Sequence, residues 1–104
     1  MSNSIRMRAN LDGNLTTVRA LISHPMETGL MKNKKTGELI PAHFIQEVVC
    51  EHNGNKVMTS HWGPAISTNP YLSFRFTGAK SGDTLKLSWV DNKGESDSAE
   101  ATVS

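Results

Sequence analysis

The side chains with the most distinctive chemistry are Cys50, His52, Met58 and His61, which lie close together in the chain. Thiolate, imidazole and thioether groups together are the ligands that copper prefers. Cys50 and His52 are two residues apart, so in a strand both side chains point to one face. Met58 and His61 have opposite parity and face opposite sides unless a bulge intervenes. A copper site is one hypothesis. The interpretation we favour is a buried thiol, two histidines at the surface or at the rim of the core, and a core methionine.

Other sets of catalytic residues are not evident. The chain has no glycine-rich phosphate loop of the required form, and no serine stands in a nucleophile-elbow sequence. Glu47 and Glu51 have strand spacing and are typical of a solvated face. A thiol such as Cys50, inside an apolar stretch, has its thiolate form disfavoured. The sequence therefore predicts a protein that is not an enzyme by itself and that uses no cofactor.

The elements that must position these residues are strands almost throughout. Apolar and polar residues alternate with the period of a half-buried strand, and Asp12-Gly13 and Asn53-Gly54 are hairpin signals between such stretches. The pattern predicts seven strands over residues 5–10, 15–23, 44–52, 56–62, 72–77, 85–90 and 99–103. We expect an all-β, immunoglobulin-like antiparallel β-sandwich of about seven strands, forming one domain over residues 1–104. One cysteine excludes the disulfide of antibody domains, and Trp89 is the expected central packing residue.

Two irregular stretches, residues 24–42 and 61–71, interrupt the strands. A connection as long as the first is often functional, and Thr36-Gly37 indicates a turn at the tip of a short hairpin arm. The basic residues Lys32, Lys34 and Lys35 either bind an anion or acidic partner or form a solvated tip, and we favour the tip. His24-Pro25-Met26 and Trp62-Gly63-Pro64 enter the loops and are either contact residues or caps of the core.

Composition and charge exclude several classes of partner. The 104 residues contain 11 Lys+Arg and 10 Asp+Glu, a net charge of +1, which leaves no electrostatic footprint for nucleic acid or an anionic membrane. Neither an apolar stretch of signal-peptide length nor one of membrane-spanning length occurs. By itself the sequence predicts a chain that is made in the cytoplasm and reaches another compartment only if something carries it.

Six further stretches are distinctive, in collinear order from the second predicted strand to the last turn. They are residues 18–29 (VRALISHPMETG), 40–45 (IPAHFI), 62–67 (WGPAIS), 69–76 (NPYLSFRF), 82–89 (GDTLKLSW) and 91–95 (DNKGE). In these stretches the chain resembles a known family, SoxZ, a subunit of the bacterial thiosulfate-oxidising Sox system.

The resemblance implies a non-catalytic partner protein. SoxZ-like chains form a heterodimer with SoxY, whose own C-terminal cysteine carries the sulfur intermediates, so Cys50 is not the carrier thiol. It also implies transient contact with the SoxXA, SoxB and SoxCD enzymes, and a periplasmic location reached by export with SoxY. Rival hypotheses are a periplasmic copper-binding sandwich and an adhesion-type module. The candidate partner-binding residues are His24, Met26, Lys32, Lys34, Lys35, His43, Trp62, Pro64 and Tyr71.

Overall fold

The computed structural model describes residues 4–104, and residues 1–3, which the one-domain prediction includes, lie outside the described residues. All seven predicted strands are present. They are β1 (Ile5–Asp12), β2 (Leu15–Ile22), β3 (Ile45–His52), β4 (Asn55–His61), β5 (Tyr71–Thr77), β6 (Thr84–Asp91) and β7 (Ser96–Thr102). Among residues 4–104 no helix is long and apolar enough to cross a membrane.

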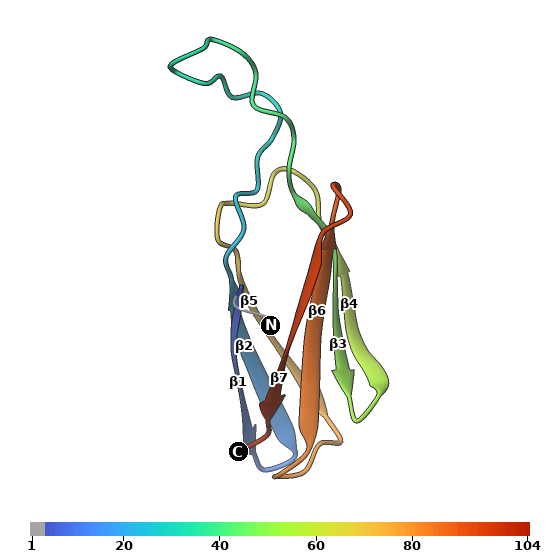
Figure 1. Ribbon diagram of the computed structural model, residues 1–104. Helices are drawn as coiled ribbons and strands as arrows, with labels where there is room; N and C mark the ends of the chain where they lie inside the picture. Colours follow the sequence, from blue (N-terminus) through green and yellow to red (C-terminus); the bar gives the residue numbers. More distant parts are fainter. Residues whose placement is uncertain (1–3) are drawn as a thin grey trace.

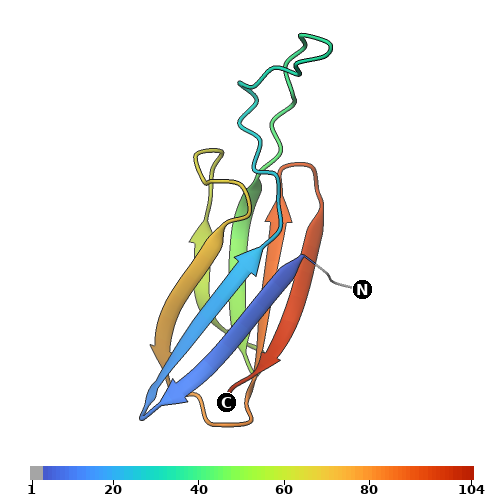
Figure 2. The ribbon, with the colours of Figure 1, turned by 90° about the vertical axis from the view of Figure 1, so that its left-hand side faces the viewer.

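The strands form two antiparallel sheets packed face to face, which confirms the predicted sandwich (Figures 1 and 2). One sheet has the order β1-β2-β5 and the other the order β4-β3-β6-β7. The β3 strand lies between β4 and β6, as its content of apolar and β-branched residues predicts. Asn53 and Gly54 both have positive φ, at 49° and 89°, which suits the tight turn that joins β3 to β4.

The core lies between the sheets and follows the predicted alternation. On β2 the residues Val18, Ala20 and Ile22 are buried, and on β6 Leu85, Leu87 and Trp89 are buried. Burial of each valine, leucine or isoleucine side chain among them stabilises the fold by roughly 1.5–3 kcal/mol. The β7 strand begins at Ser96, earlier than predicted. It is an edge strand with one ladder to β6, so its polar first residues pair without having to be fully buried.

Residues 27–43 form an arm that projects beyond the sandwich (Figure 1). Its two sides meet at isolated bridges between Glu27 and His43 and between Lys32 and Leu39. At its tip the Gly37 N–H donates to the Asn33 carbonyl oxygen over 2.8 Å, and Gly37 has a φ of +75°. The predicted hairpin arm is therefore confirmed. It makes the molecule long and narrow, 53 × 22 × 20 Å.

Candidate functional site

A group of titratable side chains around a buried carboxylate lies at the end of the sandwich from which the arm projects. It consists of His24, His43, Asp91 and Glu95, which we call the Asp91 cluster. His24 follows β2, His43 precedes β3, and Asp91 is the last residue of β6. Asp91 Oδ2 lies 3.0 Å from His24 Nε2 and 2.7 Å from His43 Nε2. The cluster therefore joins both sheets and the root of the arm.

The hydrogen bonds of His24 determine which of its ring nitrogens carries the proton. The backbone N–H of Met26 donates to His24 Nδ1 over 3.1 Å, so Nδ1 offers its lone pair. The proton is then on Nε2, which donates it to Asp91. His24 is only 4% exposed and its ring also meets the Trp89 ring edge-on, with centroids 5.1 Å apart. Both ring nitrogens are satisfied inside the protein.

His43 connects the cluster to the surface. Its Nε2 lies 2.7 Å from Asp91 Oδ2 and 2.8 Å from Glu95 Oε1. The His43 side chain is 19% exposed and the Glu95 side chain 61% exposed, whereas the Asp91 side chain has no exposed area. Solvent thus reaches the cluster only from the side of His43 and Glu95.

Asp91 stays ionised because its acceptor atoms are fully used. Its Oδ1 accepts the backbone N–H groups of Lys93 and Glu95 over 3.0 and 2.9 Å. Burial by itself raises the pKa of Asp91. The hydrogen bonds from His24, the Glu95 N–H, His43 and the Lys93 N–H outweigh it and lower the pKa to about 2.

The donor set of the cluster includes potential metal ligands. One atom each from His24, His43 and Asp91 lie within 4.8 Å of one another, and imidazole with carboxylate suits zinc and related ions. A metal on His24 Nε2 would need the lone pair of that nitrogen and would move the proton to Nδ1. Nδ1 could then no longer accept the Met26 N–H. The observed hydrogen bonds favour a structural network over a metal centre.

The β6–β7 turn also holds the root of the arm. Asn92 Oδ1 accepts the Phe44 N–H over 2.8 Å, and Asn92 Nδ2 donates to the Ala42 carbonyl oxygen over 2.9 Å. Gly29, at a φ of +85°, lies against Ala42, because a Cβ at this position would be 3.2 Å from the Ala42 Cβ. Together with His43, these contacts fix the direction in which the arm leaves the sandwich.

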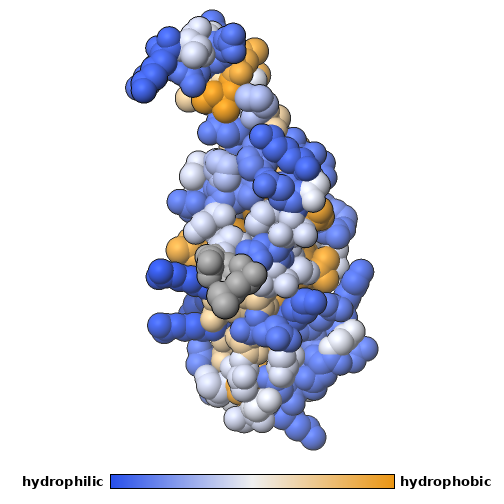
Figure 3. Space-filling view, in the orientation of Figure 1, coloured by the Kyte–Doolittle hydropathy of each residue, from blue (hydrophilic) through white to orange (hydrophobic). Residues whose placement is uncertain are grey.

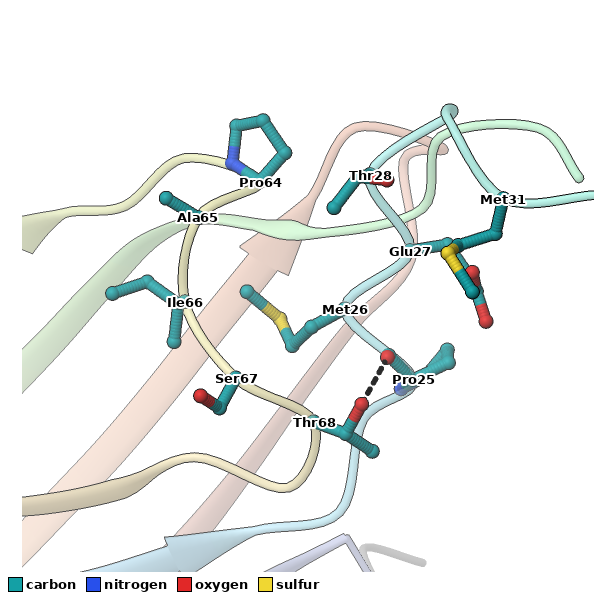
Figure 4. Close-up of a pocket in the computed structure, with 10 residues that line it drawn as sticks. All are labelled: Pro25, Met26, Glu27, Thr28, Met31, Pro64, Ala65, Ile66, Ser67 and Thr68. Atoms are coloured by element: carbon teal, nitrogen blue, oxygen red, sulfur yellow. Dashed lines mark hydrogen bonds between the residues drawn. The ribbon is translucent and has the colours of Figure 1, made fainter.

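A groove lies beside the arm root, between residues 25–31 and 64–68, with a volume of about 630 Å³ (Figure 4). In the close-up the Met26 side chain extends toward Ile66, while Pro64 and Met31 stand at opposite rims. Thr68 Oγ1 donates to the Pro25 carbonyl oxygen over 3.0 Å and closes the lower end. The groove is open to solvent and continues onto the arm.

The arm exposes apolar side chains that the sandwich cannot cover. Leu30, Met31 and Leu39 are 82%, 59% and 58% exposed. The space-filling view shows apolar side chains on the arm beneath a hydrophilic tip (Figure 3). The three predicted basic residues of the tip, Lys32, Lys34 and Lys35, are exposed. An exposed apolar group bordered by charge is typical of a protein contact.

The remaining predicted partner-binding residues have different surroundings. His24 and Met26 are both 4% exposed, so a partner would meet their neighbours rather than these side chains. Trp62 is half-buried, and its Nε1 donates to Ser60 Oγ over 2.8 Å. Pro64 is exposed on the groove rim, and Tyr71 is 62% exposed on β5. Their role in partner binding stays a prediction.

The hypothetical copper ligands are not brought together. Cys50 pairs with Met58 across β3 and β4, but His61 pairs with Glu47, whose parity places it on the outer face. The bulge lies between Cys50 and Glu51, beyond Met58, so it does not turn His61 inward. His52 Nε2 lies 2.7 Å from Asp83 Oδ2. The set of four ligands therefore does not form.

The interpretation of Cys50 as a buried thiol is confirmed. Its exposed fraction is 0%. Burial in the core, together with the nearby Glu51 carboxylate, raises the pKa of the Cys50 thiol to about 11. The thiolate, which is the nucleophilic form, is thus strongly disfavoured at neutral pH.

Sequence reasoning missed Asp91, Asn92 and Glu95. A signal was present, because Leu85, Leu87, Trp89 and Asp91 share one parity along β6. A carboxylate on the core face of a strand needs buried partners, and the histidines that enter the loops were the available donors. The separation in sequence between His24 and Asp91 hid this pairing.

The chain matches one known protein family over almost its whole length. The family model for sulphur oxidation protein SoxZ matches residues 5–102. None of the curated proteins matches the chain.

Two solved structures have a similar fold. The superoxide reductase (neelaredoxin) from Ignicoccus hospitalis has a TM-score of 0.64 and 16% identity, over 99% of this chain and 82% of that chain. A hypothetical protein from Pyrococcus horikoshii OT3 has a TM-score of 0.60 and 19% identity, over 99% of this chain and 89% of that chain. At such identities the likeness shows the sandwich fold alone.

Proposed function

The chain belongs to the SoxZ family of sulphur oxidation proteins, and we propose that it is the non-catalytic half of a two-chain sulfur carrier. Family membership supports a role in sulfur oxidation. In this proposal a companion of the SoxY type holds the sulfur intermediates on its own cysteine. The present chain holds the companion and helps the SoxXA, SoxB and SoxCD enzymes to dock.

The arm is the observation that carries this proposal. A small sandwich gains nothing in its own stability from holding Leu30, Met31 and Leu39 in water, since exposed apolar area is unfavourable. The Asp91 cluster and Asn92 nevertheless fix the arm root in one direction. A preorganised apolar projection lowers the cost of ordering on association, which suits a lasting heterodimer.

The state of the only cysteine supports the division of labour. Cys50 is fully buried and its pKa is raised to about 11. Covalent attachment of sulfur requires an accessible thiolate, whereas the Cys50 thiol is shielded from solvent and protonated at neutral pH. The reactive thiol therefore belongs on the companion. Export of the folded pair to the periplasm on the companion's signal is part of the same proposal.

The experiment is co-expression of the chain with a tagged SoxY-type companion, followed by affinity purification. The wild-type chain should co-purify in a one-to-one ratio. Leu30→Ser with Met31→Ser should lower the affinity for the companion at least tenfold, because the variant lacks two apolar side chains that the companion would cover.

The control is Val90→Ser, which removes an exposed apolar side chain of the β4-β3-β6-β7 sheet instead. We expect the control to bind the companion as the wild type does. Full binding by the arm variant, or loss of binding by the control alone, would place the companion elsewhere and contradict the proposal. Absence of any complex with the wild type would contradict the heterodimer itself.

A further inference from the structure

The arginines of this chain are gathered on one surface. The outer face of the β1-β2-β5 sheet, onto which Figure 2 looks, carries all four of them, and we call it the arginine face. Its outward positions on β1 and β2 alternate with the buried or half-buried positions that face the core. The four residues are Arg6, Arg8, Arg19 and Arg75, and all are exposed.

The strand register places these charges next to one another. Arg8 lies directly opposite Arg19 across the β1–β2 ladder, and Arg6 occupies the neighbouring outward row. Arg75 faces Thr17, one outward row from Arg19. Like charges directly opposite each other on a sheet are destabilising, so this arrangement works against the isolated fold.

On the other sheet, the lysines lie opposite glutamates. Across its outer face Lys56 lies opposite Glu51, Glu51 opposite Lys86, and Lys86 opposite Glu100. Charges of opposite sign alternate along this row, so cross-strand neighbours attract rather than repel one another. On the arginine face the only acidic residue of the three strands is Asp12, in the last row.

The arginine face is uncompensated in charge. None of the ion pairs between two residues of the range 4–104 includes an arginine. Without the four arginines, the remaining seven lysines and ten acidic residues give the chain a net charge of −3. The four arginines thus form a positively charged face on a chain whose other charges sum to −3.

The arginine face also contains a shallow depression and exposed apolar and aromatic side chains. A shallow depression of about 190 Å³ is lined by Arg6, Arg8, Arg19, Leu21 and Tyr71 among others. Leu21 and Tyr71, which lie opposite each other, are 42% and 62% exposed. Tyrosine and arginine are enriched among the residues that dominate protein interfaces, and guanidinium groups bind carboxylates in a bidentate fork.

We propose that the arginine face is a docking surface for an acidic protein surface, recognised through its carboxylates. A nucleic acid fits less well, because the rest of the chain carries net negative charge and would repel a long polyanion. The face is a separate surface from the arm and its groove. The proposal therefore goes beyond the companion contact and does not depend on it.

The test uses the full chain and a fluorescein-labelled oligoglutamate, with binding followed by fluorescence anisotropy. The wild type should bind it, with an affinity that falls as salt rises. Arg8→Gln with Arg19→Gln should weaken binding at least tenfold. The charge-conserving pair Arg8→Lys with Arg19→Lys should lose part of the affinity, because lysine cannot form the bidentate fork.

The matched control, Lys56→Gln with Lys86→Gln, removes the same charge from the other sheet and should change the affinity less than twofold. The melting temperature of Arg8→Gln with Arg19→Gln should equal or exceed that of the wild type, since a pair of like charges that face each other is removed. Three results would overturn the proposal: no binding by the wild type, equal weakening by the control, or tighter binding of an oligothymidylate of equal charge.

Discussion

His24, just beyond β2, and Asp91, at the end of β6, are joined by a hydrogen bond of 3.0 Å in the interior of the protein. These strands belong to different sheets, so the contact ties the two layers together. His43 donates to the same carboxylate oxygen and adds the arm root to the network. One buried charge therefore organises the end of the sandwich where the arm begins.

Removal of the Asp91 charge should destabilise the whole domain. Asp91→Asn leaves two imidazole N–H groups competing for one neutral oxygen, and loss of one member of a buried network costs about 3 kcal/mol or more. Urea unfolding at pH 7 measures the change in the free energy of unfolding. Asp12→Asn, an exposed carboxylate on β1, is the control and should stay within about 0.5 kcal/mol of wild type. Equal effects of the two substitutions would show that the network contributes nothing.

The contribution of Asp91 should depend on pH in a defined direction. Its pKa is lowered from an ordinary value of 3.8 to about 2 in the folded chain. The carboxylate therefore stabilises the fold fully above about pH 4, and this stabilisation is lost as the pH falls from there through 2. The difference in unfolding free energy between wild type and Asp91→Asn should shrink by roughly 2 kcal/mol over that window. A difference that is constant from pH 7 to pH 2 would contradict the lowered pKa.

Cys50 should be inert in the folded protein. A maleimide reagent at pH 7.5 should label it only at the rate at which the domain unfolds, because the thiol is buried and protonated. Cys50→Ala should retain companion binding and cost only about 1–2 kcal/mol for the small cavity. Labelling in urea provides the fully reactive reference. Rapid labelling in native buffer, or loss of carrier turnover with Cys50→Ala, would give this thiol a role that the burial does not predict.

The close approach of Gly29 to Ala42 should control the arm root. Gly29→Ala places a methyl group 3.2 Å from the Ala42 Cβ at a φ of +85°, whereas Gly37→Ala at a φ of +75° meets nothing within 4 Å. Both variants carry the left-handed strain, of about 1 kcal/mol, but only the first also displaces the arm. Amide hydrogen exchange at Glu27 and His43, which pair across the root, should accelerate in Gly29→Ala alone. Equal acceleration in both variants would mean that backbone strain by itself loosens the arm root, and would contradict a role for the contact between Gly29 and Ala42.

The basic tip of the arm should affect docking of an enzyme component. Lys34→Glu with Lys35→Glu reverses two exposed charges without touching the core, so the melting temperature should be unchanged. Thiosulfate-dependent turnover of a reconstituted Sox system should fall severalfold, and more at low salt than at high salt. Lys56→Glu with Lys80→Glu, reversed outside the arm, serves as the control. Unchanged turnover by the tip variant would show that these lysines do not contribute to docking and only form a solvated loop tip.

Alternation of residue types was sufficient to predict the sandwich. The strand period in β2 and β6 and the Asn53-Gly54 turn are local signals, because a side chain's face and a turn's backbone angles depend on nearest neighbours. The same locality predicted the arm from Thr36-Gly37 and the burial of Cys50. The family was recognisable from its irregular loops, where few sequences share the same residues in the same order.

Tertiary structure alone decided which of these residues meet. His24 and Asp91 are far apart in sequence and touch only because β2 and β6 end at the same end of the sandwich (Figure 2). In the same way, strand pairing places Arg75 beside arginines from the start of the chain and turns His61 away from Cys50. A local pattern determines which face a side chain takes, but the order and register of strands determine its neighbours, and hence its charge state and its available chemistry.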